Sequence, residues 1–249
     1  MERFCSISII IPAYNEEKYL GPGIAAMQAE IARAQRVRPG LAVEVILVDN
    51  ASTDRTAALA AAAGYCVVPE KEHNIAKVRN TGAAAATGEV IVTIDADSCI
   101  GEGTLEEVLQ TLEGGAVGGG CPIRLDDRSW HLRALAALGT FLVERAMGLG
   151  AGLYFCRRAD FVAVGGFAET LYAAEDLDFA KRLKAHGKKA GQPFKNLRHS
   201  VMTTSARKVR LFGFGRMLLL ALRTFWRPAA AIRRKDLWDR LFYDVDKLR

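Results

Sequence analysis

The sequence predicts an α/β fold in which a mostly parallel central sheet is flanked by helices, and two observations lead to it. Short runs of β-branched residues alternate with helical segments four times within the first hundred residues, which is typical of parallel strands joined by right-handed crossovers. Three of the expected strands also end in polar loops, at 12–16, 49–54 and 95–97. Because parallel strands end at the same edge of a sheet, we expect these loops to lie close together and to form a site there.

The first half of the chain contains the regular part of this pattern. Residues 5–11 are rich in isoleucine and are expected to form a buried strand that ends at Pro12. Asn15 is placed to cap the helix that follows, which extends to about Val37. Beyond it we expect, in order, a strand at 43–48, a helix at 55–63, a strand at 65–68 and a helix at 75–86.

The strand expected at 90–94 is the centre of this arrangement. Its residues are all β-branched and charged residues lie on both sides, which is typical of a short strand buried on both faces. Asp95 and Asp97 follow it two residues apart, so their carboxylates face the same way if the strand pairing persists. Two converging carboxylates repel each other unless a cation lies between them, and their oxygens suit Mg²⁺ or Mn²⁺. On its own an Asp-x-Asp tripeptide is more often a solvated turn, and its position after a buried strand is what favours a site.

The second half of the chain is less regular. Here we expect a helix at 105–112, a strand at 116–125, an apolar helix at 132–147, a strand at 150–155, a helical turn at 160–164, a helix at 177–185 ended by Gly187, and a strand-like stretch at 189–197. The glycines at 118–120 do not open a helix after a strand as a G-x-G-x-x-G motif does, which disfavours a dinucleotide-binding fold.

Length and composition indicate an ordinary globular protein. The 249 residues, 50% hydrophobic and 25% charged, can form one large α/β domain or two small ones. The five cysteines are odd in number and lack a CxxC pair, which indicates reduced thiols and neither a disulfide framework nor a zinc site. The sequence shows neither a signal-peptide pattern nor about 18 consecutive apolar residues, so we expect a cytoplasmic protein.

The net charge of +6 is unevenly placed, because Lys and Arg far outnumber Asp and Glu from Lys195 onward. This asymmetry favours a phosphate-bearing partner near the tail. Residues 211–227 place a basic face opposite a bulky apolar face on a segment too short to span a bilayer. We expect this segment to lie on an anionic membrane surface, with the protein peripheral on the inner face of the membrane. The alternative is packing against the body or across a dimer interface.

Five blocks of residues, in order and in spacing, resemble the family 2 glycosyltransferases. They lie at 8–17 (Ser-Ile-Ile-Ile-Pro-Ala-Tyr-Asn-Glu-Glu), at 49–54 (Asp-Asn-Ala-Ser-Thr-Asp), at 74–97 with Asp-Ala-Asp at its end, at 165–169 (Gly-Gly-Phe-Ala-Glu) and at 175–178 (Glu-Asp-Leu-Asp). Each block is weakly specific, and all five together are highly specific. The resemblance covers residues 6 to 187 approximately and implies a GT-A fold. It implies a single catalytic domain at 1–205, with a nucleotide-binding half at 1–98 and an acceptor-binding half at 99–205, and a basic helical extension at 206–249.

For the donor side, the resemblance implies the inverting transfer of a sugar from a nucleotide-linked donor. Asp49 has a carboxylate that can accept the N–H of uracil or guanine, and Ser52 lies in the same loop. Pro12 and Tyr14 are expected to form an apolar wall against the base, and Glu16 to bind ribose hydroxyls. The alternative is that Pro12 only ends a strand and that Tyr14 is a core aromatic residue.

We expect the diphosphate to bind Arg79, whose planar fork suits phosphate oxygens, and Lys77. The alternative is a solvated helix face, which fits Lys77 better than Arg79. The resemblance assigns Asp95 to ribose or sugar, and Asp97 to a divalent cation, Mn²⁺ or Mg²⁺, that bridges the two phosphates. In similar enzymes a downstream histidine completes the metal shell. His199 is therefore a candidate ligand, with a surface histidine as the alternative.

On the acceptor side, the resemblance assigns Asp176 as the general base that takes the proton of an acceptor hydroxyl, with Glu175 orienting the base or the acceptor. The alternative is that both are first-turn carboxylates favoured by the dipole of the following helix. Gly166 is expected to allow close approach of the backbone to the donor sugar. In similar enzymes a segment in this region closes over the diphosphate, which makes Arg207 and Lys208 candidate contacts.

Together these residues predict a metal-assisted, inverting glycosyltransferase that uses a UDP- or GDP-linked donor. Its acceptor would carry a free hydroxyl on a glycan, a lipid-linked molecule or a small molecule, and nucleic acid is not among the expected partners. The alternative is a catalytically silent GT-A module that binds a nucleotide sugar, or that binds a partner through its basic tail. A nucleotidyltransferase is disfavoured, because no Gly-rich triphosphate loop bearing Arg or Lys follows the first strand.

Overall fold

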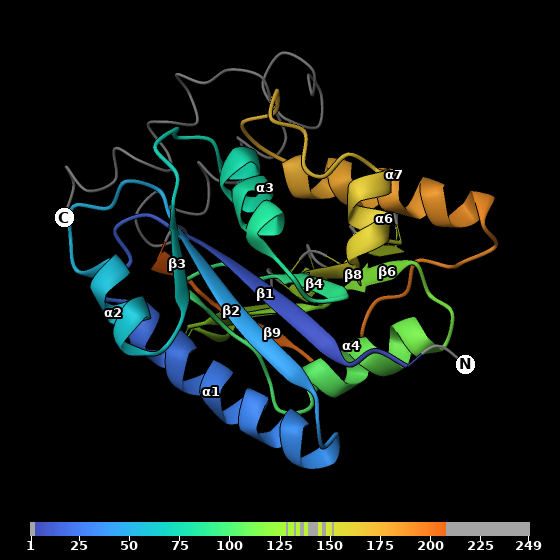
Figure 1. The fold of residues 1–249 in the computed structure, drawn as a ribbon, viewed down its shortest axis with the longest axis horizontal. Helices are drawn as coiled ribbons and strands as arrows, with labels where there is room; N and C mark the ends of the chain where they lie inside the picture. The colour runs from blue at the N-terminus through green and yellow to red at the C-terminus, as the bar shows by residue number, and fades with distance from the viewer. Residues whose placement is uncertain are drawn as a thin grey trace.

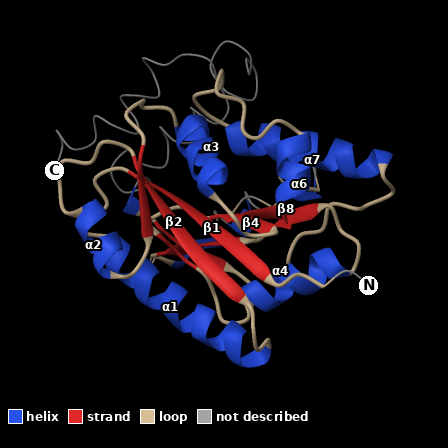
Figure 2. Ribbon diagram, viewed as in Figure 1, coloured by secondary structure: helices blue, strands red, loops and turns tan. Residues whose placement is uncertain are grey.

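The central sheet of the protein has six strands and is covered by helices on both faces (Figure 1). This computed structural model describes residues 3–127, 129–131, 133–134, 137–138, 144–145, 148–150 and 152–207. The strands of the central sheet are β1 (Ser6–Ala13), β2 (Ala42–Asp49), β3 (Cys66–Pro69), β4 (Val90–Thr93), β6 (Gly118–Gly120) and β8 (Tyr154–Arg157). The helices, blue in Figure 2, are α1 (Leu20–Val37), α2 (Thr56–Ala62), α3 (Ile75–Ala85), α4 (Thr104–Glu113), α6 (Arg158–Ala163) and α7 (Glu175–Lys189).

The strand order is β3-β2-β1-β4-β8-β6, in which the first four strands are parallel and β8 is antiparallel to both β4 and β6. Ala13 lies opposite Asp49, and Asp49 lies opposite Pro69, so β1, β2 and β3 end level with one another. On the other side of β1, the last residue of β4, Thr93, lies opposite Ile10. The prediction of an α/β fold with a mostly parallel sheet is confirmed, and the carboxyl ends of four strands lie at one edge.

A second sheet has three strands in the order β5-β9-β7. They are β5 (Ser98–Cys99), β7 (Ile123–Asp126) and β9 (Met202–Ser205), with β9 antiparallel to β5 and parallel to β7. The N–H of Ser205 donates to the carbonyl oxygen of Asp97 over 3.2 Å. The last described segment of the chain is thereby held against the turn that follows β4.

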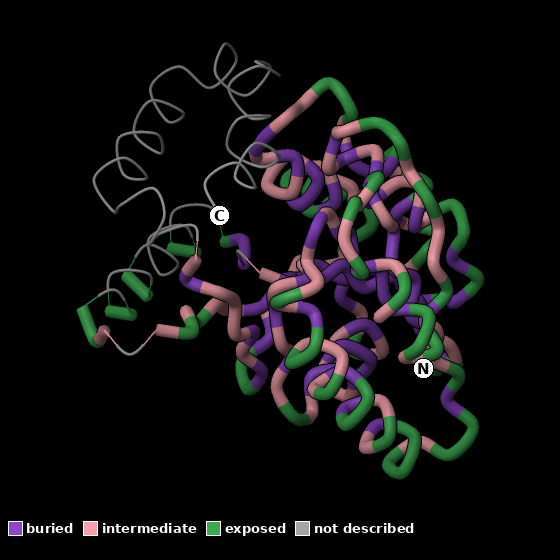
Figure 3. The backbone as a smooth tube through the Cα atoms, turned by 90° about the vertical axis from the view of Figure 1, so that its left-hand side faces the viewer, coloured by how far each residue is buried: buried purple, intermediate pink, exposed green. Residues whose placement is uncertain are grey.

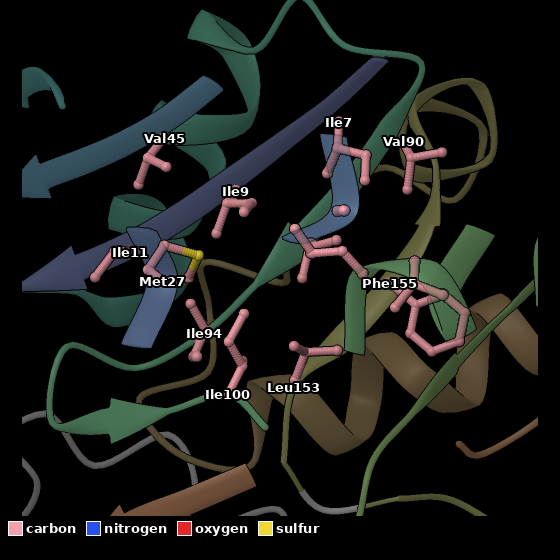
Figure 4. Packing of buried hydrophobic residues seen from close by; sticks show 14 of the residues in the cluster. Ile7, Ile9, Ile11, Met27, Val45, Val90, Ile94, Ile100, Leu153 and Phe155 are labelled. Atoms are coloured by element: carbon pink, nitrogen blue, oxygen red, sulfur yellow. The ribbon is translucent and has the colours of Figure 1, made fainter. Parts of the chain in front are cut away.

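Each face of the central sheet is covered by its own apolar cluster. The helices α1, α2 and α4 pack on one face, together with Ile7, Ile9 and Ile11 of β1 (Figure 4). The helices α3, α6 and α7 pack on the other face, where Ile10 contributes. Burying one such side chain contributes roughly 1.5–3 kcal/mol, so a strand with apolar residues on both faces is favoured only in the middle of a layered fold. Figure 3 shows the result, with buried segments through the middle of the body and exposed turns around it.

The cap expected for α1 is wrong. This helix begins at Leu20 with Tyr19 at its N-cap, and Asn15 lies before it in a left-handed conformation with φ 51°. The Asn15 side-chain oxygen accepts the N–H of Thr53 over 2.8 Å. Its side chain therefore joins the loop after β1 to the loop after β2 in place of capping the helix.

Two strands of the second half differ from the prediction. The strand expected at 116–125 is divided between the two sheets, as β6 and β7, with Cys121 and Pro122 between them. The stretch expected as a strand at 189–197 forms only an isolated bridge from Phe194 to Gly118, and the strand of this region is β9. Both differences have the same cause: the partner strands that define these short strands are far away in the sequence.

Gly187 does not end α7, which continues to Lys189. A Cβ atom at Gly187 would lie 2.5 Å from Cγ1 of Val117 and 2.5 Å from the carbonyl oxygen of Gln192. This glycine therefore permits close packing of the helix against the chain around it and does not act as a helix stop.

Part of the prediction lies outside the described residues. This holds for most of the helix expected at 132–147 and for the tail from Lys208 onward, including the segment 211–227. The division of the chain at 98 and at 205 stays a prediction. Among the helices that the structure describes, none combines the length and the apolarity that a bilayer span requires.

Candidate active site

A cavity of about 330 Å³ lies at the carboxyl edge of the central sheet. Its lining comes from the loops after β1, β2 and β4, from α3, from the start of α7 and from Arg207, the second residue after β9. The residues are Pro12, Ala13, Tyr14, Glu16, Asn50, Ile75, Val78, Arg79, Asp95, Ala96, Asp97, Ala173, Ala174, Glu175, Asp176 and Arg207. The three polar loops therefore converge as expected, and the cavity has a volume typical of small-molecule sites.

The loop after β1 is held in place by the loop after β2. The N–H of Asn15 donates to Oγ of Ser52 over 3.0 Å, and the N–H of Glu16 donates to Oγ1 of Thr56 over 2.8 Å. Ser52 does not line the cavity itself. Its hydroxyl instead fixes the backbone that carries Tyr14 and Glu16 into the cavity.

One end of the site has Tyr14 in the cavity lining, whereas Asp49 lies outside the lining beside Asn50, which belongs to it. Asp49 ends β2, and its Oδ1 atom is buried without a hydrogen-bond partner among the described residues. A buried carboxylate oxygen without a hydrogen-bond donor favours a ligand that offers an N–H group. Tyr14 lines the cavity with its ring edge-on to His73, 5.0 Å between ring centroids. Asn50, the neighbour of Asp49, donates to the carbonyl oxygens of Glu70 and Glu72 and so ties this end to the loop before α3.

An arginine and three carboxylates form the centre of the site. Nη2 of Arg79 lies 2.9 Å from Oδ1 of Asp95, and Nη1 forms an ion pair with Glu175. The side chains of Arg79 and Glu175 are only 10% and 8% exposed, whereas Asp95 is 48% exposed. Burial opposes the charge of Arg79, but Glu175, Asp95 and Asp176 outweigh it and raise its pKa, so the guanidinium is always charged.

Asp176 is the second residue of α7 and lines the same cavity. The loss of water contact in the cavity wall, together with the charge of Glu175 beside it, raises the pKa of Asp176 to about 7, although Arg79 acts in the opposite direction. A carboxylate with a pKa near the working pH can accept a proton and release it again. Asp176 therefore has the chemistry of a general base.

Asp97 lies beside a second arginine. Its side chain is 8% exposed, Oγ1 of Thr204 donates to its Oδ1 over 3.4 Å, and Nη2 of Arg207 lies 3.5 Å from its Oδ2. Arg207 also forms a two-armed ion pair with Glu16, in which Nη1 lies 2.9 Å from Oε2. Its guanidinium stacks 4.3 Å from the ring centroid of Tyr19. Arg207, the second residue after β9, is thus fixed in the lining of the cavity.

The carboxylates of Asp97 and Asp95 are the groups that could hold a metal ion. Within the described ranges, no group of three or more His, Cys, Asp or Glu side chains could hold one. Mg²⁺ is commonly bound by one or two carboxylates together with the phosphates of a substrate. The donor set therefore fits a divalent cation that shares its coordination with a diphosphate.

His199 and Gly166 are not brought into the cavity lining. His199 is exposed, and its N–H donates to Oε1 of Glu107 on α4 over 3.1 Å. Gly166 has φ 63°, and a Cβ atom there would lie 2.7 Å from Oδ1 of Asn80. Oδ1 of Asn80 accepts the N–H of Phe167, so this glycine lets the chain turn closely against α3.

The sequence reasoning missed several residues of the cavity. Ile75 and Val78 add an apolar wall, and a signal for them exists, because Ile75 lies three positions before Val78 and four positions before Arg79 on α3. Ala173 and Ala174 have no such signal. Ala174 adopts a left-handed conformation with φ 55° and thereby directs the start of α7 into the cavity.

Comparison with known proteins places these observations in a family. The model of the family described as "Glycosyl transferase family 2" matches residues 8–157. An uncharacterized glycosyltransferase of Mycobacterium tuberculosis is 32% identical over 111 residues, which cover 45% of this chain and 45% of that protein. The undecaprenyl-phosphate 4-deoxy-4-formamido-L-arabinose transferase of Serratia proteamaculans is 27% identical over 165 residues, 63% of this chain and 48% of that protein. The chain spans about half the length of these relatives.

Solved structures share the GT-A fold. The mannosyltransferase of Pyrobaculum calidifontis, in complex with GDP-Man and Mn²⁺, matches with a TM-score of 0.62 and 22% identity over 84% of this chain and 61% of that one. TarS 1–349 of S. aureus, in complex with UDP-GlcNAc, matches with a TM-score of 0.59 and 19% identity over 80% of this chain and 58% of that one. At these identities the likeness is one of fold.

Proposed function

The chain belongs to glycosyl transferase family 2, and we propose that it transfers a sugar from a UDP- or GDP-linked donor to an acceptor hydroxyl, with inversion at the anomeric carbon. The observation that carries the proposal is a single cavity into which the carboxylates after β4 and the carboxylates at the start of α7 both face. A donor held by the first group would present its sugar to the second.

The nucleoside would bind next to Pro12 and Tyr14 in the cavity lining, close to Asp49, which lies outside the lining. The unpartnered Oδ1 of Asp49 suits the N–H of uracil or guanine. Ribose hydroxyls would bind near Glu16, which Arg207 holds in the cavity lining. The complexes of the two structural neighbours with UDP-GlcNAc and with GDP-Man are consistent with either base.

The diphosphate would lie next to Asp97 and Asp95, which would hold Mn²⁺ or Mg²⁺ together with it. Such a cation neutralises the negative charge that a nucleoside diphosphate gains as it leaves. Arg207 brings a further positive charge to within 3.5 Å of Asp97 and so would also face the diphosphate. The Mn²⁺ in the Pyrobaculum neighbour supports this assignment.

Asp176 would act on the acceptor. As the acceptor oxygen forms its bond to the anomeric carbon, its proton passes to Asp176, and the bond from that carbon to the diphosphate breaks on the opposite side. The raised pKa of Asp176 suits this step, because a stronger base takes the proton more readily. Glu175 lies beside it and is fixed by its ion pair with Arg79.

Three classes of acceptor are candidates for the hydroxyl that receives the sugar. A relative that acts on undecaprenyl phosphate supports a lipid-linked molecule as one candidate class. Such an acceptor suits a protein that lies on the inner membrane face through residues 211–227, although that segment falls outside the described residues. Glycans and small molecules with a free hydroxyl are the other candidates.

A screen of UDP- and GDP-sugars with Mn²⁺ tests the proposal. Each donor is incubated with the protein, and the release of nucleoside diphosphate is measured without an acceptor and with candidate acceptors. We expect one donor to be hydrolysed slowly and to be turned over faster when its acceptor is added. Binding of a donor without release under any condition would instead support a silent nucleotide-sugar-binding module.

A further inference from the structure

We propose that Arg79 is a positioning residue, which holds Glu175 and Asp95 together across the cavity and so fixes Asp176 for proton transfer, and that it does not bind the donor diphosphate. The inference rests on the proposed function, since it assigns a role within the same site. It differs from the expectation raised by the sequence alone, in which the fork of Arg79 meets phosphate oxygens.

Both terminal nitrogens of the Arg79 guanidinium already have a carboxylate partner, while its Nε is buried without a partner among the described residues. Nη1 pairs with Glu175 and Nη2 lies 2.9 Å from Oδ1 of Asp95. The two partners are 96 and 16 residues away in the sequence. One side chain on α3 therefore ties the start of α7 to the turn after β4, and the positions of the two halves of the cavity depend on it.

The guanidinium of Arg79 also packs against buried aromatic side chains. It lies 5.3 Å from the ring centroid of Phe167, which stacks on Phe179 at 4.5 Å and contacts Phe161. These aromatic residues belong to the buried cluster under α3, α6 and α7. If Arg79 turned toward a phosphate, the buried carboxylate of Glu175 would lose its ion pair, which is strongly unfavourable.

The positive charge of Arg79 acts on the pKa of Asp176 together with the other groups around that carboxylate. Glu175 lies beside it on α7, Asp95 faces it from the turn after β4, and Tyr154 faces it from β8. Burial and the two carboxylates raise the pKa of Asp176, whereas Arg79 and the backbone N–H of Leu177, which donates to Asp176 Oδ1 over 2.7 Å, lower it. Without this charge, Asp176 would stay protonated to higher pH and would fail as a base at neutral pH.

The fork and the charge of Arg79 can be separated by two substitutions. Arg79→Lys keeps a positive charge but cannot reach both carboxylates with two arms. Arg79→Met keeps a long side chain over Phe167 and removes both the charge and the fork. The rate of the wild-type enzyme and of both variants is measured from pH 5 to pH 9 with the donor found in the screen. The affinity for UDP and for GDP with Mn²⁺ is measured by calorimetry.

We expect both variants to lose at least about tenfold in kcat, because a misplaced base is costly to the reaction. The affinity for UDP or GDP with Mn²⁺ should fall by less than kcat, because Arg79 would affect the donor only through the position of Asp95. The acidic limb of the pH–rate profile should move up by about one pH unit or more in Arg79→Met, and it should stay in place in Arg79→Lys.

Arg157 provides a matched control. Its side chain is 14% exposed, it stacks 5.5 Å from the ring centroid of Phe4, and it pairs with Asp160 at 3.3 Å, but it does not line the cavity. Arg157→Lys should therefore change stability at most and leave the pH–rate profile and kcat as in the wild type. A change like that of Arg79→Lys in this control would mean that any buried arginine has the same effect, and would overturn the inference.

Two further results would overturn it. One is wild-type kcat in Arg79→Lys, which remains decisive even if Arg79→Met fails to fold. The other is a selective loss of UDP and GDP affinity in Arg79→Lys with kcat unchanged, which would assign Arg79 to the diphosphate. A wild-type protein that turns over no donor would be a different failure, since it removes the proposed function and this role with it.

Discussion

At the scale of single residues, the cavity holds neighbouring carboxylates in different environments. Glu175 is buried but paired with Arg79, whereas Asp176 has no ion pair among the described residues and carries a pKa raised to about 7. The pair thus divides into a side chain held by an arginine and a side chain that can change its protonation at neutral pH. Such a division is what a proton transfer requires of two adjacent acids.

Asp176→Asn should abolish turnover and keep donor binding. The amide has the size of the carboxylate but cannot take a proton, so we expect a loss of about 10² to 10⁴ in kcat, measured by release of nucleoside diphosphate. Asp178→Asn is the control, since Asp178 lies in the same turn of α7 and pairs with Arg182 at 2.7 Å outside the cavity. Weakened UDP and GDP binding in Asp176→Asn would contradict the assignment and indicate a structural role.

The rate of the wild-type enzyme should fall with decreasing pH through about 7. A general base must be ionised, and Asp176 becomes protonated as the pH falls below its pKa of about 7. The kcat/KM for the acceptor, measured from pH 5 to pH 9, should therefore be half-maximal close to neutrality. A profile that stays flat down to pH 5 would exclude Asp176 as the base.

At the scale of elements, α3 is the helix on which the site depends. It packs against β1 and β2 through Gly82, where an added Cβ would lie 2.5 Å from Cγ2 of Ile10 and 2.9 Å from Cγ2 of Val48. Its start is capped by Asn74, whose side-chain oxygen accepts the N–H groups of Ala76 and Lys77. Close packing at one end and a cap at the other fix the helix, and with it the guanidinium of Arg79.

Gly82→Ala should destabilise the protein by about 1–3 kcal/mol, because the new methyl group overpacks a buried helix–sheet contact. Urea unfolding monitored by circular dichroism measures the effect. Gly21→Ala is the matched control on α1, since an added Cβ there meets nothing within 4 Å. It should be neutral or stabilise by roughly 0.5–1 kcal/mol, as alanine is the better helix former. Equal losses in the two variants would show that the contact to β1 and β2 is not the cause.

At the scale of the whole molecule, the cavity is assembled from segments between Pro12 and Arg207. Asp97 and Thr204 meet through the small sheet, and Arg207 reaches back to Glu16 from the far end of the described chain. A ligand in the cavity therefore contacts both halves of the fold at once. Its binding should stabilise the folded state as a whole.

UDP or GDP with Mn²⁺ should raise the melting temperature in one cooperative transition, and EDTA should remove most of the shift. At a ligand concentration of about 100 times Kd the stabilisation is about 2.7 kcal/mol. Asp97→Ala should lose the Mn²⁺-dependent part of the shift. Glu102→Ala, which removes an equal charge at a side chain 86% exposed, should keep it. An unchanged Mn²⁺ response in Asp97→Ala would show that the cation binds elsewhere.

Local patterns in the sequence were sufficient to predict the parallel half of the fold and the carboxylates of the site. The strand at 90–94, the alternating isoleucines of β1 and the polar loops after β1, β2 and β4 are local patterns, and local patterns specify elements and the edge at which they end. Asp97 and Asp176 could be singled out because their types and positions suit a cation and a base.

How these residues are used depends on contacts that form in the folded chain. Contacts between residues far apart in the chain decide four features of the site and the fold. They determine the partners of Arg79 and Arg207 and the division of 116–125 between two sheets. They also determine the role of Asn15 between two loops and the position of His199 outside the cavity lining. Such contacts do not follow the periodicity of a helix or a strand in the sequence, because they form only after the sheet has brought the segments together.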